Sequence, residues 1–164
     1  MSARMKKKRR LGLISDTHGL LRNEVYGAFK GVDEILHAGD VGDRSIITEL
    51  EVIAPVQAVY GNVDGRDIRS EFPEALELER AGHTLAMIHG HQWGSPHVED
   101  LVDRYPGRSI IIFGHTHLGM IEKVAGSLVI NPGSAGQRRF GLPVSVAILT
   151  LKQGEEPVAK LLKL

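Results

Sequence analysis

The sequence predicts a mixed α/β layered sandwich built from one domain. Up to about residue 118, short apolar runs rich in Val and Ile alternate with stretches of helical spacing. Beyond that point the pattern changes to paired apolar runs around tight turns. Strands that alternate with helices, followed by antiparallel strands, indicate sheets covered by helices. A chain of 164 residues fits a single domain.

Five apolar runs are the predicted strands of the first part. They cover residues 11–15, 34–38, 56–60, 84–88 and 109–113. Runs of four to six residues enriched in β-branched side chains favour buried strands over helices. Each run is followed by a glycine or a polar residue, which marks the end of the strand.

Three helices are expected between these strands, over residues 25–29, 46–53 and 96–105. Asp43 is the expected N-cap of the second helix and Ser95 of the third, because short polar side chains accept a hydrogen bond from the first turn. Two hairpins are expected after residue 118. The first joins residues 120–125 to 128–131 around Gly126-Ser127, and the second joins residues 144–151 to 157–164.

The charges are unevenly distributed although the formal net charge is +0. Six of the 20 basic residues lie in the first ten positions, so residues 11–164 carry 14 basic and 20 acidic residues. We expect residues 1–10 to form a solvated, disordered arm and residues 11–164 to form the domain. An arm that binds nucleic acid is the less favoured alternative.

Composition excludes several classes of protein. The chain has no cysteine, which excludes disulfides, thiolate zinc sites, iron–sulfur clusters and cysteine nucleophiles. No apolar run approaches the length of a membrane-spanning helix. The apolar stretch after the basic arm is too short for a signal peptide. The reducing cytoplasm is the expected location.

A potential metal ligand follows each of the five predicted strands. These residues are Asp16, His18, Asp40, Asn62, His89, His115 and His117. Ligands of open α/β sheets bind outside the carboxyl ends of the strands, so we expect these side chains to converge in one crevice. Any one of them alone is more often a turn residue. Their joint occurrence in a chain with eight histidines favours a metal site.

The spacing within the motifs supports this interpretation. The side chains of residues i and i+2 of an extended chain point the same way. We therefore expect Asp16 and His18 to point toward one site, and His115 and His117 likewise. Glycines at positions 39, 61 and 114 should let the chain turn sharply after three of the strands.

Seven ligands are too many for one tetrahedral ion, which takes four. They fit two ions that share a ligand, and a carboxylate such as Asp40, central in the chain order, can bridge. Two ions about 3.5–4 Å apart form the clamp that stabilises attacking and leaving oxygens in phosphoryl transfer. Two divalent ions, two aspartates and a bridging hydroxide carry a net positive charge that attracts a phosphate.

The motifs also resemble those of a known family, the calcineurin-like metallophosphoesterases. They are Asp-Thr-His-Gly at 16–19, Gly-Asp at 39–40, Gly-Asn at 61–62, His-Gly at 89–90 and Gly-His-Thr-His at 114–117. With Asn-Pro-Gly-Ser at 131–134, they resemble the small single-domain bacterial and archaeal phosphodiesterase branch. The resemblance covers about residues 11–151 and implies a four-layer α/β/β/α sandwich of two mixed sheets flanked by helices.

The same resemblance implies a ligand set and a reaction. One metal would be held by Asp16, His18, Asp40 and His117, and the other by Asp40, Asn62, His89 and His115. The ions would be manganese, iron, zinc or nickel, since nitrogen and oxygen ligands suit all of them. A hydroxide that bridges the two ions would attack phosphorus in line, with Asn62 also near the phosphate.

One position departs from the larger phosphatases of this superfamily. Val63 stands where they carry a histidine that helps the leaving group depart. We therefore expect phosphodiesters and activated esters to be better substrates than alkyl monoesters. His91 should face the same crevice as His89 and is a candidate substitute acid, although a hydrogen bond within the loop is the simpler interpretation. His37, inside the second strand, is expected to be a core residue.

Two other functions stay open. The retromer small subunit has this fold and serves as an interaction module with a degraded metal site, so a non-catalytic scaffold is the main alternative. The complete set of seven ligands favours catalysis. Arg138 and Arg139 either reach a phosphate or form an exposed charged loop. The expected partner is a small phosphate ester, not a membrane or a nucleic acid, and the chain is free to form a homo-oligomer.

Overall fold

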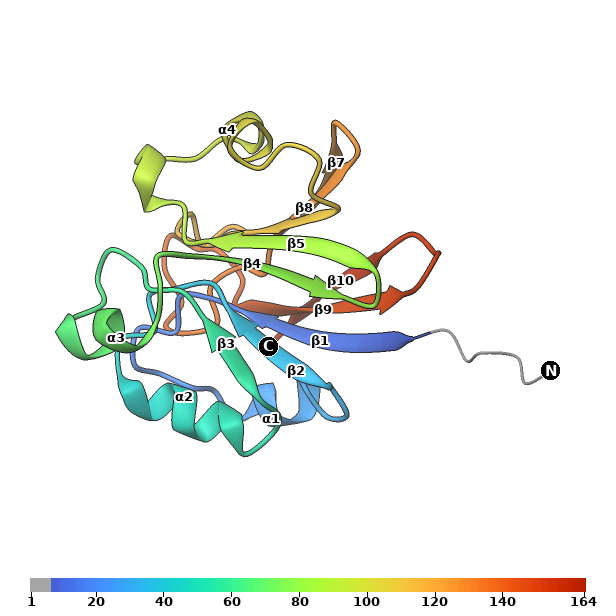
Figure 1. Cartoon of the computed structure of the whole chain (residues 1–164). Coiled ribbons are helices and arrows are strands. Elements are labelled where there is room, and N and C mark those ends of the chain that lie inside the picture. The colour runs from blue at the N-terminus through green and yellow to red at the C-terminus, as the bar shows by residue number, and fades with distance from the viewer. Residues whose placement is uncertain (1–6) are drawn as a thin grey trace.

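Two five-stranded mixed sheets pack face to face between outer layers of helices (Figure 1). This computed structural model describes residues 7–164. It confirms the four-layer α/β/β/α sandwich: three helices, one sheet, the second sheet and one helix. None of the helices in this part of the chain is long and apolar enough to cross a membrane.

The first sheet has the strand order β10-β9-β1-β2-β3. Its strands are β1 (Lys8–Ile14), β2 (Glu34–His37), β3 (Val56–Ala58), β9 (Ser145–Lys152) and β10 (Val158–Lys163). The first three are parallel, whereas β9 pairs antiparallel with both β1 and β10. The carboxyl ends of β1, β2 and β3 therefore lie at one edge of the sheet.

The second sheet has the strand order β4-β5-β6-β8-β7. Its strands are β4 (Ala75–Arg80), β5 (His83–Ile88), β6 (Ile110–Ile112), β7 (Met120–Val124) and β8 (Ser127–Asn131). Strands β5, β6 and β8 are parallel, and β4 and β7 close the sheet as antiparallel edges.

The helices lie on the outer faces of the two sheets. Helices α1 (Glu24–Ala28), α2 (Arg44–Glu51) and α3 (Arg66–Glu71) cover the first sheet, and α4 (Val98–Arg104) covers the second (Figure 1). A short 3-10 turn, η1 (His91–Trp93), follows β5. Asp43 caps α2 as predicted, since its Oδ1 accepts a hydrogen bond from the Ser45 N–H at 2.8 Å.

Strand β1 shows how alternation builds the layers. Leu11 and Leu13 pack in the cluster between the two sheets, whereas Ile14 packs against the helices. Gly12 faces the helices as well, and a Cβ there would lie 2.9 Å from the Phe29 ring. The helix layer can therefore approach this strand closely only because residue 12 has no side chain.

The predicted basic arm is wrong at its boundary. Residues 8–10 belong to β1 and pair with residues 150–152 of β9. The Arg10 N–H also donates to Asp33 Oδ2 at 2.7 Å. The cationic side chains of residues 8–10 are typical of a solvated tail, but backbone pairing with β9 holds these residues in a strand. Residues 1–6 of the predicted arm lie outside the described residues.

Three elements, α3, β4 and η1, are missing from the sequence prediction. Residues 75–79 alternate between apolar and charged or small side chains, so Leu76 and Leu78 pack between the sheets while Glu77 and Glu79 face outward. Three of the six residues of this edge strand are charged, so its sequence does not have the apolar composition by which the other strands were predicted. It pairs with β5 across a two-residue turn, Ala81-Gly82, at φ 48° and 78°.

Two predictions of element ends are also wrong, the N-cap of α4 and the turn between β7 and β8. Helix α4 is capped by His97 in place of Ser95, because the His97 N–H donates to Asp100 Oδ2 at 2.8 Å. The β7–β8 turn lies one residue earlier than predicted, at Ala125-Gly126. Both turn residues have positive φ, at 50° and 82°, which is the geometry of a tight hairpin.

Candidate metal centre

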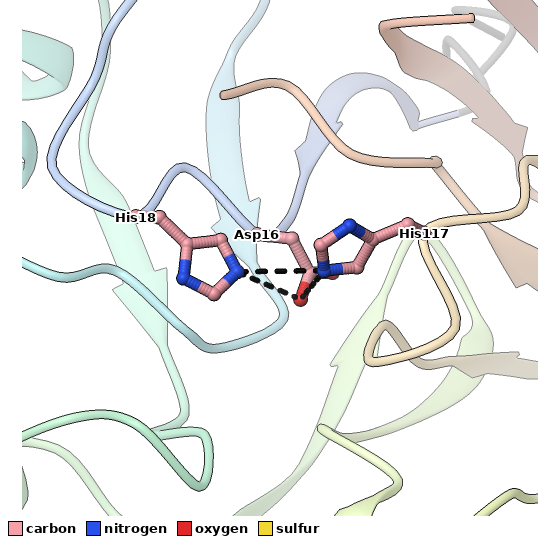
Figure 2. A group of neighbouring side chains, drawn as sticks. All are labelled: Asp16, His18 and His117. Carbon is pink, nitrogen blue, oxygen red and sulfur yellow. Dashed lines mark hydrogen bonds and ion pairs between the residues drawn. The ribbon is translucent and has the colours of Figure 1, made fainter. Parts of the chain in front are cut away.

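Six of the seven predicted ligands lie in two groups of three at one edge of the sandwich. Asp16, His18 and His117 form the first group, shown in Figure 2, and Asp40, His89 and His115 form the second. In each group one ligand atom per residue lies within 4.8 Å of the others. Both groups combine side chains that follow strands of the first sheet with side chains that follow strands of the second.

The two groups adjoin through the carboxylates. Asp40 Oδ2 lies 3.2 Å from His89 Nε2 and 3.7 Å from His18 Nε2, so it faces both groups. Asp16 Oδ1 lies 3.3 Å from His117 Nε2 and 3.9 Å from His89 Nε2. Each aspartate thus lies near imidazoles of both groups.

Several buried atoms of the groups lack a hydrogen-bond partner. Asp16 Oδ1 and His89 Nε2 have none, and the 3.2 Å approach of His89 to Asp40 lacks hydrogen-bond geometry. His18 and His117 turn their Nε2 atoms toward each other at 3.4 Å (Figure 2). Buried polar atoms are normally paired. Imidazole nitrogens and carboxylate oxygens gathered in this way fit a divalent transition metal.

Backbone carbonyls fix the tautomers of two of the imidazoles. His89 Nδ1 lies 2.7 Å from the Ala38 carbonyl oxygen, and His115 Nε2 lies 2.6 Å from that of Gly94. A carbonyl only accepts, so each of these nitrogens carries the proton. In the neutral ring the other nitrogen then has a free lone pair, as in metal-binding histidines oriented by an outer hydrogen bond.

The ligands leave their strands through left-handed backbone conformations. Among the described residues, five of the eight non-glycine residues with positive φ are ligand candidates: Asp16, His18, Asp40, His115 and His117. Each such residue costs on the order of 1–3 kcal/mol and persists only where the surroundings impose it. Hydrogen bonds between the loops impose it here, from Asp16 N–H to the Gly39 carbonyl and from His18 N–H to the Asp40 carbonyl, both at 3.0 Å.

This conformation corrects the argument from extended spacing. Asp16 and His18 do converge on one group, but His115 and His117 enter different groups. The left-handed turns, and not an extended chain, set these directions.

The predicted role of the three glycines is correct for one of them. Gly39 has a φ of 100° and provides the sharp turn. Gly61 and Gly114 have no positive φ, and a Cβ on them would collide with Asp40 Oδ1 and Ser15 Oγ, respectively. They are glycines because the carboxylate of Asp40 and the hydroxyl that bonds Asp16 occupy that space.

Both carboxylates are held by donors on their other oxygen. Asp16 Oδ2 accepts from Ser15 Oγ at 2.7 Å and from the His115 N–H at 3.1 Å. Asp40 Oδ1 accepts from the Val63 N–H at 3.0 Å. One oxygen of each aspartate is thereby fixed, while the other faces the imidazoles.

The electrostatics keep Asp40 ionised. Burial alone would raise the pKa of Asp40, but the His89 imidazole, the Val63 N–H and His18 outweigh it and lower this pKa to about 2. Burial alone would lower the pKa of His89, because it disfavours the charged imidazolium, yet Asp40 and Asp16 outweigh it and raise this pKa. Burial lowers the pKa of His18. An anionic carboxylate between imidazoles is the charge arrangement that binds a cation.

Asn62 and His91 flank these groups. Asn62 is exposed and directly precedes Val63, whose N–H binds Asp40, so it lies in the same loop as predicted. The His91 ring centroid lies 5.5 Å from that of His89 and 6.4 Å from that of His115, with its Nδ1 buried and unpaired. Burial, His89 and His115 lower the pKa of His91. The His91 ring thus lies beside the second ligand group, next to His89 as the sequence predicts.

Asp64 is a positioning residue that the sequence did not reveal. Its Oδ1 accepts from the Gly42 N–H at 2.9 Å, and its Oδ2 accepts from Gly61 at 2.8 Å and from Val41 at 3.2 Å. It therefore ties the loop after β2 to the loop after β3. A carboxylate two residues after Asn62 was the available signal, but nothing in the sequence shows that it is buried.

The segment at 131–134 holds the remaining loops. Asn131 Nδ2 donates to the Gly114 carbonyl and to Thr116 Oγ1, both at 3.0 Å, and Ser134 Oγ donates to the Asp16 carbonyl at 3.1 Å.

His37 is a core residue as predicted. Its Nδ1 accepts from the Gly39 N–H at 3.2 Å, and burial lowers its pKa to about 4.

Comparison with known proteins finds that the chain is similar to metallophosphoesterases. The family model described as the calcineurin-like phosphoesterase superfamily domain matches residues 10–154. A probable metallophosphoesterase of Methanothermobacter thermautotrophicus is 35% identical over 162 residues, which cover 93% of this chain and 91% of that protein. A phosphodiesterase of Methanocaldococcus jannaschii is 29% identical, with 89% and 95% covered.

Solved structures agree on the fold. A structure described as a novel archaeal phosphodiesterase has a TM-score of 0.75 and 28% identity, and the match covers 94% of this chain and 99% of that one. Vacuolar Protein Sorting 29 of Cryptosporidium parvum has a TM-score of 0.80 at 18% identity, with 96% and 98% covered. At that identity the second likeness shows the fold alone.

Proposed function

This chain belongs to the calcineurin-like phosphoesterase superfamily, and from that premise we propose that it is a metal-dependent phosphohydrolase that prefers phosphodiesters. The observation that carries the proposal is the pair of adjoining ligand groups with Asp40 between them. The relatives named as phosphodiesterases support the preference for diesters.

The residues at this edge fit two divalent ions. One ion would be held by Asp16, His18, His117 and the shared Asp40, and the other by Asp40, Asn62, His89 and His115. Manganese, iron, zinc and nickel all suit such a mixture of ligands. When bound, two such ions supply the positive charge that activates water for in-line attack and offsets the charge developing on phosphorus.

The protein's contribution is to fix this geometry in advance. Asp40 stays anionic at neutral pH because its pKa is about 2. The hydrogen bond from His89 to the Ala38 carbonyl fixes the ring that faces Asp40. Asp64 and Asn131 act as positioning residues. Asp64 holds backbone N–H groups of the two loops that carry Asp40 and Asn62, and Asn131 holds the loop that carries His115 and His117 through the Gly114 carbonyl and the Thr116 hydroxyl.

Help for the leaving group is weak at this site. Val63 is 53% exposed beside Asn62, and its side chain has no proton to give. We propose that His91 donates to the departing oxygen, because its ring adjoins His89 and His115. The lowered pKa of His91 keeps most of this imidazole neutral at pH 7. Diesters with good leaving groups therefore fit the site better than alkyl monoesters.

The test combines metal analysis with turnover. Protein stripped with a chelator is reloaded with manganese, iron, zinc or nickel, and the metal content per chain is measured. Rates are then compared on bis(p-nitrophenyl) phosphate and p-nitrophenyl phosphate. We expect about two ions per chain and faster hydrolysis of the diester. One ion per chain, or a faster monoester, would contradict the dinuclear diesterase.

A non-catalytic scaffold is the second candidate, because Vacuolar Protein Sorting 29 shares the fold at a TM-score of 0.80. The ligand groups argue against it, since they remain complete and contain unpaired buried atoms. Protein that binds none of the four metals and hydrolyses neither ester would favour the scaffold.

A further inference from the structure

An exposed aromatic side chain stands directly beside the first ligand group. Phe140 is 83% exposed, and its ring centroid lies 6.0 Å from that of His117 at an interplanar angle of 60°. His117 itself is buried. The Phe140 ring therefore contacts a ligand candidate on one side and is open to solvent on the other.

The backbone at Phe140 is strained. The Leu142 N–H donates to the Arg139 carbonyl at 3.0 Å, which closes a tight turn. The two central residues, Phe140 and Gly141, have φ values of 56° and 65°. A bulky residue at positive φ is an outlier, and such strain concentrates at ligand-binding sites. Gly141 is an ordinary occupant of this conformation, whereas Phe140 is not.

Both ends of this loop are fastened to the site. The Gly136 N–H donates to the Asp16 carbonyl at 3.2 Å, and the Gly136 carbonyl accepts from Arg22 Nε at 2.9 Å. On the other side, the Ser145 N–H donates to the Ser134 carbonyl at 3.0 Å. The loop over residues 137–142 thus directly follows the segment that is hydrogen-bonded to the Asp16 loop. This connection keeps Phe140 next to the ligand group.

We propose that Phe140 is a stacking platform for a planar aromatic group of the substrate, so that the site selects aryl or nucleoside phosphate esters over alkyl ones. The proposal rests on the proposed function, because a phosphate bound at the ligand groups brings its ester substituent beside His117. An aromatic ring offers a face or an edge to a planar group, whereas an alkyl group gains only apolar contact. Base–aromatic stacking tolerates any base, since every base has a π-face.

The charge of the loop agrees with an anionic ligand. Arg138 and Arg139 are exposed and immediately precede Phe140. Both residues therefore place positive charge on the loop that carries Phe140. Cationic side chains around a cleft raise the local concentration of anions such as phosphate esters.

The experiment measures binding in place of turnover. Calorimetry with manganese-loaded protein compares phenylphosphonate with methylphosphonate, which differ only in the aromatic ring. A second pair, adenosine 5′-monophosphate and ribose 5-phosphate, differs only in the base. We expect each aromatic member to bind at least about fivefold more tightly than its partner. The phenyl and nucleoside pairs together tell whether any aryl group or only a nucleobase is accepted.

The substitution Phe140→Ala should remove the aromatic preference, so that phenylphosphonate binds no more tightly than methylphosphonate. Phe140→Trp should retain the preference. Val52→Ala, at the 79% exposed residue that ends α2, is the matched control and should change nothing. Equal binding within both pairs, or a preference that survives in Phe140→Ala, would overturn the platform. Failure of methylphosphonate to bind the metal-loaded wild type would instead count against the proposed function.

Discussion

The two edges of the sandwich use charged side chains in opposite ways. At the amino ends of β1 and β2, Glu34 accepts from Arg80 through both carboxylate oxygens, at 2.8 and 2.9 Å. At the carboxyl ends, Asp40 is buried to a similar degree, but its partners are imidazoles that also face a second aspartate. The first edge is electrostatically closed, whereas the second contains buried atoms without partners.

The difference separates structural charge from functional charge. A bidentate pair such as Glu34 and Arg80 satisfies both side chains and asks for no ligand. A cluster of buried lone pairs without hydrogen-bond partners carries a desolvation cost that a bound cation would offset. Burial alone does not distinguish the two edges, but hydrogen-bond satisfaction does.

The largest expected effect comes from removing metal. Chelation should abolish phosphodiester hydrolysis, and adding back the ion should restore it, while the far-ultraviolet circular dichroism stays native. The reason is that the apolar clusters of the four layers pack without any metal ligand. Unfolding on chelation would show that the carboxyl edge is a structural site.

The substitution Asp40→Asn should be the most damaging single change. It removes the charge between the two ligand groups and should lower kcat/KM and metal content, the former by at least about 100-fold. Glu34→Gln, which neutralises a buried carboxylate at the opposite edge, is the control and should leave both unchanged. An Asp40→Asn protein with two ions per chain and normal turnover would break the comparison.

The next effect concerns the leaving group. A positioned general acid contributes about 10²–10⁴-fold, mostly for poor leaving groups. Because Val63 cannot act as an acid, rates on a series of aryl phosphodiesters should fall steeply as the pKa of the phenol rises. Val63→His should flatten this dependence, and His91→Ala should make it steeper. A flat series in both wild type and His91→Ala would mean that another group supplies the proton.

Acid sensitivity should arise in part from His37, which is buried under the site. Its folded pKa of about 4 lies below the ordinary 6.5, so between these values the unfolded chain binds a proton that the folded chain does not. Its contribution is complete above pH 6.5 and is lost as the pH falls toward 4, by about 3 kcal/mol. Chelator-treated His37→Gln should therefore lose less stability than treated wild type over this range, as measured by urea unfolding. Parallel curves for the two proteins would contradict the assignment.

The smallest expected effect belongs to the closed edge. Glu34→Gln should lower the free energy of unfolding by about 1–2 kcal/mol, because Arg80 loses a charged partner but remains partly solvated. The activity should not change. Urea unfolding at pH 7 measures the loss, and a fall in activity without a fall in stability would show that the two edges communicate.

The sequence predicted which side chains gather at the carboxyl edge better than it predicted how they are arranged there. Ligand residues such as Asp16 and His89 follow apolar runs directly, so the strand pattern alone brings them to one edge. The division of His115 and His117 between two groups depends on left-handed φ values that no local pattern displays. Asp64 was missed because burial of a loop carboxylate depends on which distant N–H groups approach it.

The fold shows the same division. Strands rich in Val and Ile, such as β6, are evident from composition, and the family resemblance supplied the four layers. Strand β4 escaped because its alternating glutamates resemble a solvated face. The start of β1 escaped because pairing with β9, which is about 140 residues away, outweighs the cationic side chains of residues 8–10.

Ligands drawn from both sheets have a mechanical consequence. A bound ion would act as a clasp between the two halves of the sandwich, since Asp16 and His18 follow β1 while His117 follows β6. Opening the clasp requires the sheets to slide or separate at that edge. The rate at which bound metal exchanges with metal in solution would then report the rate of this shearing motion. Exchange should be slow in the intact sandwich and faster in a protein in which a distant mutation loosens the packing between the sheets.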